Sequence, residues 1–106
     1  MADGPVRAYQ LTPAAQSDLE TIWRFTANRW SVGQAEAYLN GLRDALEDLI
    51  ANPRIARERL ELTPPVRVQP YGSHIIIYTI EIDYLAVIRI RHSRENWISD
   101  PAGEDE

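Results

Sequence analysis

The spacing of apolar residues divides the chain into a helical first half and a strand-rich second half. In the first half, apolar residues recur every three or four positions from Ala15 to Trp30, which is the period of an amphipathic helix. Thr12 and Pro13 stand directly before this stripe, and threonine suits a helix cap while proline suits the first helical position. The pattern predicts a helix that begins at Pro13 and places Trp23 in the buried stripe.

The sequence predicts a second helix directly after the first. Ser31 and Gln34 have the capping-box spacing, in which both side chains satisfy free backbone N–H groups at a helix start. The apolar stripe then continues to Asn52 and Pro53, where proline cannot extend the helical hydrogen bonds. Because the connection is short, the two segments are predicted to form an antiparallel helical hairpin, with Trp30 as an apolar staple at its corner.

After residue 65 the apolar residues no longer follow a helical period. Three segments rich in Ile, Val and Tyr are separated by turn residues, which is typical of an antiparallel meander; they are 66–71, 74–82 and 85–91. A short strand is also expected at 6–11, whereas the charged segment 54–65, which ends in two prolines, is expected to be a connector. The order predicts an α+β fold, β-α-α-β-β-β, with the helical hairpin packed on one face of a small antiparallel sheet.

Alternation along the last predicted strand separates an apolar face from a polar one. Ile88 and Ile90 are expected on one face, and Arg89 and Arg91 on the other. His92 has the same parity as the two isoleucines, so its side chain is expected to point towards the core. The face that carries the two arginines is expected to be polar.

The middle strand, 74–82, is apolar on both faces. Every second residue of 76–82 lies on the face expected to meet the helices, while Ile75 and Ile77 lie on the opposite one. A strand of this kind needs cover on both sides. The hairpin can cover only one side, so Ile75 and Ile77 require either the C-terminal segment around Trp97 or a partner protein.

The composition is that of an ordinary globular domain. The chain has 106 residues, of which 44% are hydrophobic and 25% charged, and it has no cysteine, which excludes disulfides and cysteine-based zinc sites. One domain is expected over 1–98, followed by an acidic, disordered tail over 99–106. No segment has the length and hydrophobicity of a membrane span, and a cytoplasmic protein is expected.

Charge argues against direct contact with nucleic acid. The sixteen acids outnumber the eleven cations, all arginine, but five of the acids lie at Asp3 and in 99–106, so the body of the domain is close to neutral. Nucleic-acid-binding proteins usually carry a strongly basic surface, so no direct sequence-specific DNA binding is expected. The chain also lacks a Gly-rich phosphate loop, a zinc-spaced histidine pair and a nucleophile elbow, so no metal, cofactor or catalytic residue is predicted.

Several short motifs follow one another along the chain: Leu11-Thr12-Pro13-Ala14-Ala15, Asp18-Leu19, Ile22-Trp23, Trp30 with Gln34-Ala35 and Tyr38, Asn52-Pro53, Tyr71-Gly72-Ser73-His74, Ile77-Tyr78 and the whole of 87–97. In their order and spacing they resemble the ParE-type toxins of the RelE/ParE superfamily. No single motif is specific, but together they extend over nearly the whole chain. The resemblance implies a RelE/ParE-like fold with the same order of elements that the apolar pattern predicts.

The resemblance also implies a toxin that acts by binding rather than as an enzyme. ParE-type toxins belong to bacterial type II toxin-antitoxin systems, which are associated with plasmid stabilisation, and they inhibit DNA gyrase by trapping it with cleaved DNA. A cognate antitoxin, commonly the ribbon-helix-helix DNA-binding protein ParD, neutralises them in a hetero-oligomer. The expected partners of this chain are therefore a ParD-like antitoxin and gyrase.

Two sets of residues are expected to make these contacts. The target-facing set carried over by resemblance is Arg67, Arg89, Arg91, His92, Arg94 and Trp97. The set expected to meet the antitoxin is Ile75, Ile77, Trp30 and Tyr38. As simpler alternatives, the two arginines of the last strand pair with acids on a solvated face, at Glu81 or Glu95, and Trp97 only anchors the C-terminus. His74 is expected to be a turn residue.

The alternative function is that of RelE-type members of the superfamily, which are ribosome-dependent mRNA endonucleases. Such chemistry needs cations at the phosphate and an acid-base group near the 2'-hydroxyl. The residues available for it are Arg67, Arg89, Arg91 and His92. However, His92 is expected to point away from the arginines, lysine is absent, and an acidic tail suits the ribosome's phosphate surface poorly. Gyrase inhibition therefore ranks ahead of RNA cleavage.

Overall fold

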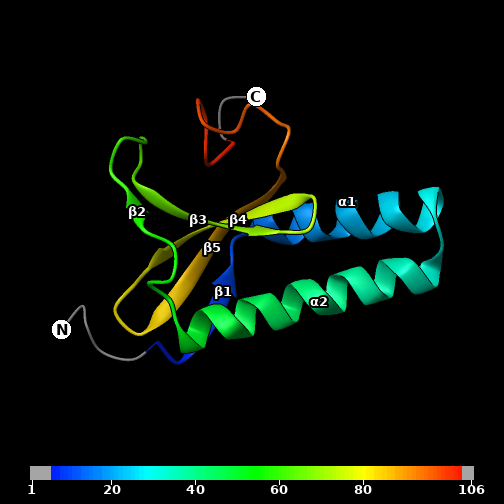
Figure 1. Ribbon diagram of the computed structural model, residues 1–106, viewed down its shortest axis with the longest axis horizontal. Helices are drawn as coiled ribbons and strands as arrows, with labels where there is room; N and C mark the ends of the chain where they lie inside the picture. The colour runs from blue at the N-terminus through cyan, green and yellow to red at the C-terminus, as the bar shows by residue number, and fades with distance from the viewer. Residues whose placement is uncertain (1–5, 104–106) are drawn as a thin grey trace.

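Two helices lie against one face of a five-stranded sheet in the computed structural model, which describes residues 6–103 (Figure 1). The helices are α1 (Pro13–Arg29) and α2 (Val32–Ala51). The strands are β1 (Ala8–Leu11), β2 (Glu58–Arg59), β3 (Val66–Tyr71), β4 (His74–Ile80) and β5 (Tyr84–His92). Their order in the sheet is β1-β5-β4-β3-β2, with β1 parallel to β5 and all other pairs antiparallel. The predicted α+β class and the hairpin on one face of the sheet are confirmed.

Both helices begin where the capping residues predict. The Thr12 hydroxyl accepts a hydrogen bond from the Ala15 N–H at 3.0 Å and donates one to the Ile88 carbonyl of β5 at 2.7 Å. The Ser31 hydroxyl accepts from the Gln34 N–H at 3.0 Å. The first cap thus ties α1 to the sheet as well as starting it. Within residues 6–103, neither helix has the length and apolar character of a membrane span.

The main core lies between the helices and the sheet. Tyr78 of β4 is fully buried there, and its hydroxyl donates to the Pro53 carbonyl at 2.7 Å, which satisfies the polar end of the ring. Burial raises the pKa of this hydroxyl above its usual value. The prediction that Trp23 belongs to the core is wrong, because Trp23 is 36% exposed and the adjacent Ile22 takes the inward position.

The connector predicted at 54–65 contains an edge strand that the sequence pattern does not reveal. β2 pairs with the start of β3, and Leu62, which follows it, is buried. A two-residue strand made of charged residues has no apolar alternation, so a period-based prediction misses it. Short charged edge strands also discourage further strand pairing.

The second face of β4 is covered by this chain itself. Ile75 is 5% exposed and Ile77 is fully buried, in a second core that also contains Leu62, Val68 and Trp97. Of the two alternatives that the sequence leaves open, the C-terminal segment around Trp97, and not a partner protein, covers these isoleucines. The expectation that a partner protein covers Ile75 and Ile77 is wrong, because side chains of the same domain already exclude water from them.

A β-bulge interrupts the pairing of β4 with β5. Ile77 pairs with Arg89 but the next residue, Tyr78, pairs with Val87, which leaves Ile88 without an opposite residue. One extra residue reverses the alternation of the strand at that point. Odd- and even-numbered residues of β5 therefore exchange faces at the bulge, so a single alternation does not assign the faces on both sides of it.

The bulge changes which side chains share a face of β5. Val87 and Ile90, three residues apart, both belong to the core under the helices, whereas Ile88 packs against the second core. The prediction that Ile88 and Ile90 share a face is wrong. His92 does lie on the same side as Ile90, as its parity predicts. β4 ends before Ile82, which was expected on the inner face and is 77% exposed.

Candidate functional site

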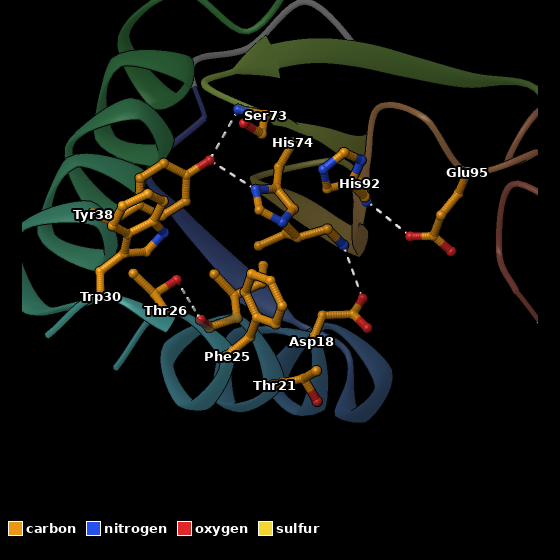
Figure 2. Close-up of a pocket in the computed structure, with 12 residues that line it drawn as sticks. Asp18, Thr21, Phe25, Thr26, Trp30, Tyr38, Ser73, His74, His92 and Glu95 are labelled. Carbon is orange, nitrogen blue, oxygen red and sulfur yellow. Dashed lines mark hydrogen bonds between the residues drawn. The ribbon is translucent and has the colours of Figure 1, made fainter. Parts of the chain in front are cut away.

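A cleft of about 390 Å³ opens where the helical hairpin meets the ends of β4 and β5 (Figure 2). The residues that line it are Asp18, Thr21, Ile22, Phe25, Thr26, Trp30, Tyr38, Ser73, His74, Ile90, His92 and Glu95. Both helices and both strands contribute, so the cleft depends on the whole fold rather than on one loop. We call this region the aromatic cleft.

The outer wall of the aromatic cleft is formed by two exposed aromatic rings. Phe25 is 64% and Trp30 is 65% exposed, and Figure 2 shows both on the helical side of the cleft. A shallower hollow between the helices shares Thr26, Trp30 and Tyr38 with the cleft, so the two form one continuous groove. Large apolar rings left in water and grouped around a concavity are typical of a partner-binding surface.

The floor of the aromatic cleft holds a hydrogen-bonded chain of polar groups (Figure 2). The Tyr38 hydroxyl lies 2.7 Å from Nδ1 of His74 and accepts a hydrogen bond from the Ser73 N–H at 3.2 Å. The ring of His92 lies edge-on to that of His74, with 5.3 Å between their centroids. His74 is the first residue of β4 and lines the cleft, so the prediction that it is a turn residue is wrong.

The surroundings of His74 disfavour its protonation. Burial, followed by the neighbouring His92, lowers the pKa of His74, although Glu95 and Asp18 oppose the shift. Nδ1 of His92 accepts a hydrogen bond from the Arg94 N–H at 3.1 Å. Burial raises the pKa of Tyr38, which keeps its hydroxyl protonated. The floor thus offers ring and hydroxyl groups that can donate or accept hydrogen bonds.

The two carboxylates that line the aromatic cleft are tied to arginines of β5. Nε and Nη2 of Arg89 donate to the two oxygens of Asp18 at 2.7 and 2.8 Å, and one of these oxygens also accepts the Ile90 N–H at 2.9 Å. Nη2 of Arg91 donates to Glu95 at 3.1 Å. The free edge of β5 beyond β1 is therefore closed by side chains of the domain.

The pKa of Glu95 reflects these contacts. Partial burial acts to raise it, but hydrogen bonds from the His92 N–H and from Arg91 outweigh burial and hold this pKa below its usual value. Glu95 is thus an ionised partner of Arg91, as one of the two simpler alternatives anticipates. At Glu81, the other predicted partner, the described contact is a hydrogen bond that its carboxylate accepts from the Thr79 hydroxyl at 2.8 Å.

The C-terminal residues pack over the same two arginines. Nη1 of Arg89 donates to the carbonyls of Ala102 and Gly103 at 3.1 and 3.4 Å, and Nη1 of Arg91 donates to the Asp100 carbonyl at 2.9 Å. The expectation of a disordered tail is therefore wrong for residues 99–103, because guanidinium donors fix their backbone. Residues 104–106 lie outside the described part of the chain.

The remaining target-facing candidates are scattered. Nη1 of Arg67 donates to the Ala56 carbonyl at 2.6 Å, so this arginine braces the connector. Trp97 is 8% exposed in the second core, with the guanidinium of Arg59 stacked on its ring at 5.6 Å, which matches the simpler interpretation of an anchor. Arg94 is exposed. The six predicted residues thus do not form one open surface, and only His92 reaches the aromatic cleft.

The antitoxin-facing candidates separate into two pairs. Trp30 and Tyr38 come together at the aromatic cleft, while Ile75 and Ile77 lie buried on the opposite face of the sheet. Sequence reasoning missed Phe25, whose aromatic ring lies off the apolar stripe of the first helix, and this position is the signal that could have identified it. An exposed aromatic residue on the polar side of an amphipathic helix has no packing role within the hairpin.

Comparison with known proteins identifies the family. Residues 9–97 match the family model described as the ParE toxin of the type II toxin-antitoxin system parDE. Toxin ParE1 of Mycobacterium tuberculosis is 44% identical over 87 residues, which are 81% of this chain and 89% of that protein. Toxin ParE1 of Caulobacter vibrioides is 29% identical over 91 residues, which are 86% of this chain and 94% of that one.

A solved structure shares the fold at lower identity. The structure described as the chromosomal ParDE TA system from P. aeruginosa has a TM-score of 0.70 and 14% sequence identity, and the match covers 83% of this chain and 96% of that chain. Its likeness supports the same arrangement of hairpin and sheet. Since the family model extends over most of the residues, the chain belongs to the ParE toxin family of type II toxin-antitoxin systems.

Proposed function

We propose that this ParE-family protein is a cytoplasmic toxin that inhibits DNA gyrase by binding, and that a ParD-like ribbon-helix-helix antitoxin neutralises it in a hetero-oligomer. The gyrase target and a role in plasmid stabilisation rest on family membership. The proposal that an antitoxin binds at the aromatic cleft is carried by one observation, the exposed rings of Phe25 and Trp30 around it. Covering them removes apolar surface from water at about 25 cal/mol per Å².

The sheet edges offer few free backbone groups for an added strand, which favours an antitoxin that binds in the groove. On the free part of β5, the Ile88 carbonyl and the N–H groups of Ile90 and His92 already bond to side chains. On β3, beyond its pairing with β2, Pro70 has no N–H to offer. An amphipathic helix that inserts apolar side chains between Trp30 and the floor of the aromatic cleft fits these constraints better.

Binding is also favoured over RNA cleavage by the chemistry of the cleft. A nuclease needs cations placed to stabilise a crowded phosphate. The arginines near the two histidines are instead bonded to Asp18 and Glu95, and these two carboxylates line the aromatic cleft. Because these arginines are paired with carboxylates, their charge is not available to stabilise a phosphodiester. We therefore propose that the toxin acts by binding and not as an enzyme.

Two assays run side by side test this function. Purified protein is expected to inhibit gyrase supercoiling and accumulate cleaved DNA, to leave mRNA intact on programmed ribosomes, and to release gyrase when a ParD-like antitoxin is added. Arg94→Gln, at an exposed residue of the proposed target-facing set, is expected to weaken inhibition, whereas Arg43→Gln on the outer side of α2 serves as its matched control. RNA cleavage without gyrase inhibition would reverse the assignment.

A further inference from the structure

The guanidinium groups of Arg89 and Arg91 hold the C-terminal residues through backbone atoms. Their Nη1 donors bond the carbonyls of Asp100, Ala102 and Gly103. These contacts do not depend on the identity of the side chains that follow the last strand. In Figure 1 the C-terminal segment lies beyond the sheet on the side away from α2.

Each of the two arginines bonds one carboxylate and, through a separate nitrogen, the peptide backbone. Asp18 neutralises Arg89 and Glu95 neutralises Arg91, at 2.7 and 3.1 Å. With one carboxylate paired to each arginine, the Nη1 donors bond uncharged peptide carbonyls. A polypeptide backbone is the natural occupant, and in this structure the occupant is the chain's own C-terminal segment.

Residues 99–103 pack closely over Arg89 and Arg91, but they leave one nitrogen of Arg91 without a partner among the described residues. Pro101 is fully buried, and Gly103 has a φ of +67°, where a Cβ atom would collide with Nη1 of Arg89. In contrast, Nε of Arg91 is buried without a hydrogen-bond partner among the described residues. An unpaired buried donor opposes closure, so the segment is held by a few specific contacts that a competing backbone can replace.

We propose that residues 99–103 form a latch that covers the peptide-binding donors of Arg89 and Arg91, and that the latch opens so that an extended segment of the target polypeptide accepts the same hydrogen bonds. This inference rests on the proposed gyrase inhibition, because it assigns the two arginines to the target-facing surface. The latch keeps that surface closed in the free toxin. Its opening equilibrium then sets the apparent affinity for the target.

Two substitutions within the latch destabilise its closed form without replacing any residue of β5. Gly103→Ala places a Cβ atom against Arg89 and an L-residue in the left-handed region, which costs enough to shift the equilibrium about 5- to 30-fold towards opening. Pro101→Ala removes buried contacts at a separate point. Gly33→Ala is the matched control, because it adds the same methyl group where the nearest atom lies at 3.9 Å.

The test combines hydrogen exchange of the 99–103 amides with gyrase inhibition by the full-length variants. Gly103→Ala and Pro101→Ala are expected to speed exchange in this segment and to lower the concentration needed for inhibition several-fold, while Gly33→Ala changes neither. Faster exchange with unchanged or weaker inhibition would overturn the latch and leave the proposed function intact. If neither wild type nor opened variants inhibit gyrase, both proposals fail, and a gain of affinity for duplex DNA alone would also overturn the latch. If one variant does not fold, the other decides.

Discussion

The hairpin end of the molecule and the C-terminal end of β5 distribute burial in opposite ways. At the hairpin end, the rings of Phe25 and Trp30 are 64% and 65% exposed. At the β5 end, the side chains of Arg89 and Arg91 are only 16% and 12% exposed. Burying a guanidinium group costs free energy unless the group is paired, and ion pairs and backbone carbonyls within the domain compensate for this cost. An aromatic ring left in water contributes little to folding and can still be buried by a partner.

The rings of Phe25 and Trp30 are therefore largely open in the free protein, with only the Arg29 guanidinium described over the Trp30 ring at 5.4 Å, whereas the chain's own C-terminal residues close the β5 end. The two regions nevertheless meet at Asp18 and Glu95, which line the aromatic cleft and pair with Arg89 and Arg91. A partner seated in the cleft would therefore contact the carboxylates that hold the other end closed. Mutations can separate the two regions, because changes at the aromatic cleft are expected to alter mainly the affinity for the antitoxin, whereas changes at the β5 end alter the stability of the domain and, through the latch, the proposed binding of the target.

The largest contrast is expected between two tryptophans. Trp97→Ala removes a ring that is 8% exposed in the second core, and is expected to lower the free energy of unfolding by about 3–5 kcal/mol. Trp30→Ala removes a ring that is 65% exposed and is expected to change it by less than about 0.5 kcal/mol. Urea denaturation followed by circular dichroism measures both. Equal losses would show that the aromatic cleft is part of the structural core.

The next effect concerns the carboxylate shared by the two regions. Asp18→Asn keeps the shape of the side chain but removes the charge that Arg89 requires, and it is expected to cost about 3 kcal/mol of stability because a mostly buried guanidinium loses its counterion. Glu61→Gln breaks the exposed pair with Arg57, at 3.2 Å, and is the matched control with no measurable change in the urea midpoint. A neutral result for Asp18→Asn would mean that water already screens the pair.

The antitoxin-binding half of the comparison is expected to give an intermediate effect. Phe25→Ala and Trp30→Ala are each expected to weaken binding of a ParD-like antitoxin at least tenfold, since exposed aromatic residues that become fully covered dominate interface energies. Ile82→Ala, at an apolar residue that is 77% exposed outside the cleft, is the control and should bind normally. Isothermal titration calorimetry gives the dissociation constants. If all three variants bind alike, the antitoxin lies elsewhere.

The sequence predicts the regular parts of this fold because local chemistry determines them. Caps at Thr12 and Ser31 fix the helix starts, and the change of apolar period after residue 65 fixes the meander. The bulge at Ile88 is not predictable from alternation, because an extra residue in one strand is defined only by its partner strand. β2 is missed for a related reason, since a charged two-residue strand exists only through its pairing with β3.

The candidate site is less predictable than the fold. Strand parity correctly indicates that Arg89 and Arg91 share a face, but parity does not show that Asp18, 71 residues away from Arg89, neutralises that arginine. The pattern also indicates that Ile75 and Ile77 need cover, and the domain supplies it with Trp97. A sequence pattern shows that an apolar or charged face needs a partner, but it does not show whether residues elsewhere in the same chain provide that partner. That information comes from long-range contacts.

The smallest expected effect is a difference in pH dependence between the two regions. At the cleft, the folded-state pKa of His74 lies below the usual histidine value of about 6.5, so the unfolded chain binds the proton first and stability decreases as the pH falls from about 6.5 towards the folded pKa. At the β5 end, Glu95 also has a lowered pKa, so its contribution is present above about 4.5 and is lost only at more acidic pH. His74→Gln is expected to flatten the free energy of unfolding between about pH 7 and 5. Glu95→Gln removes a charge that opposes the lowering of the His74 pKa, so it should keep or slightly steepen the slope in that window and lose the contribution of Glu95 below it. Urea denaturation at successive pH values tests both, and loss of the slope between pH 7 and 5 in Glu95→Gln, but not in His74→Gln, would contradict this division.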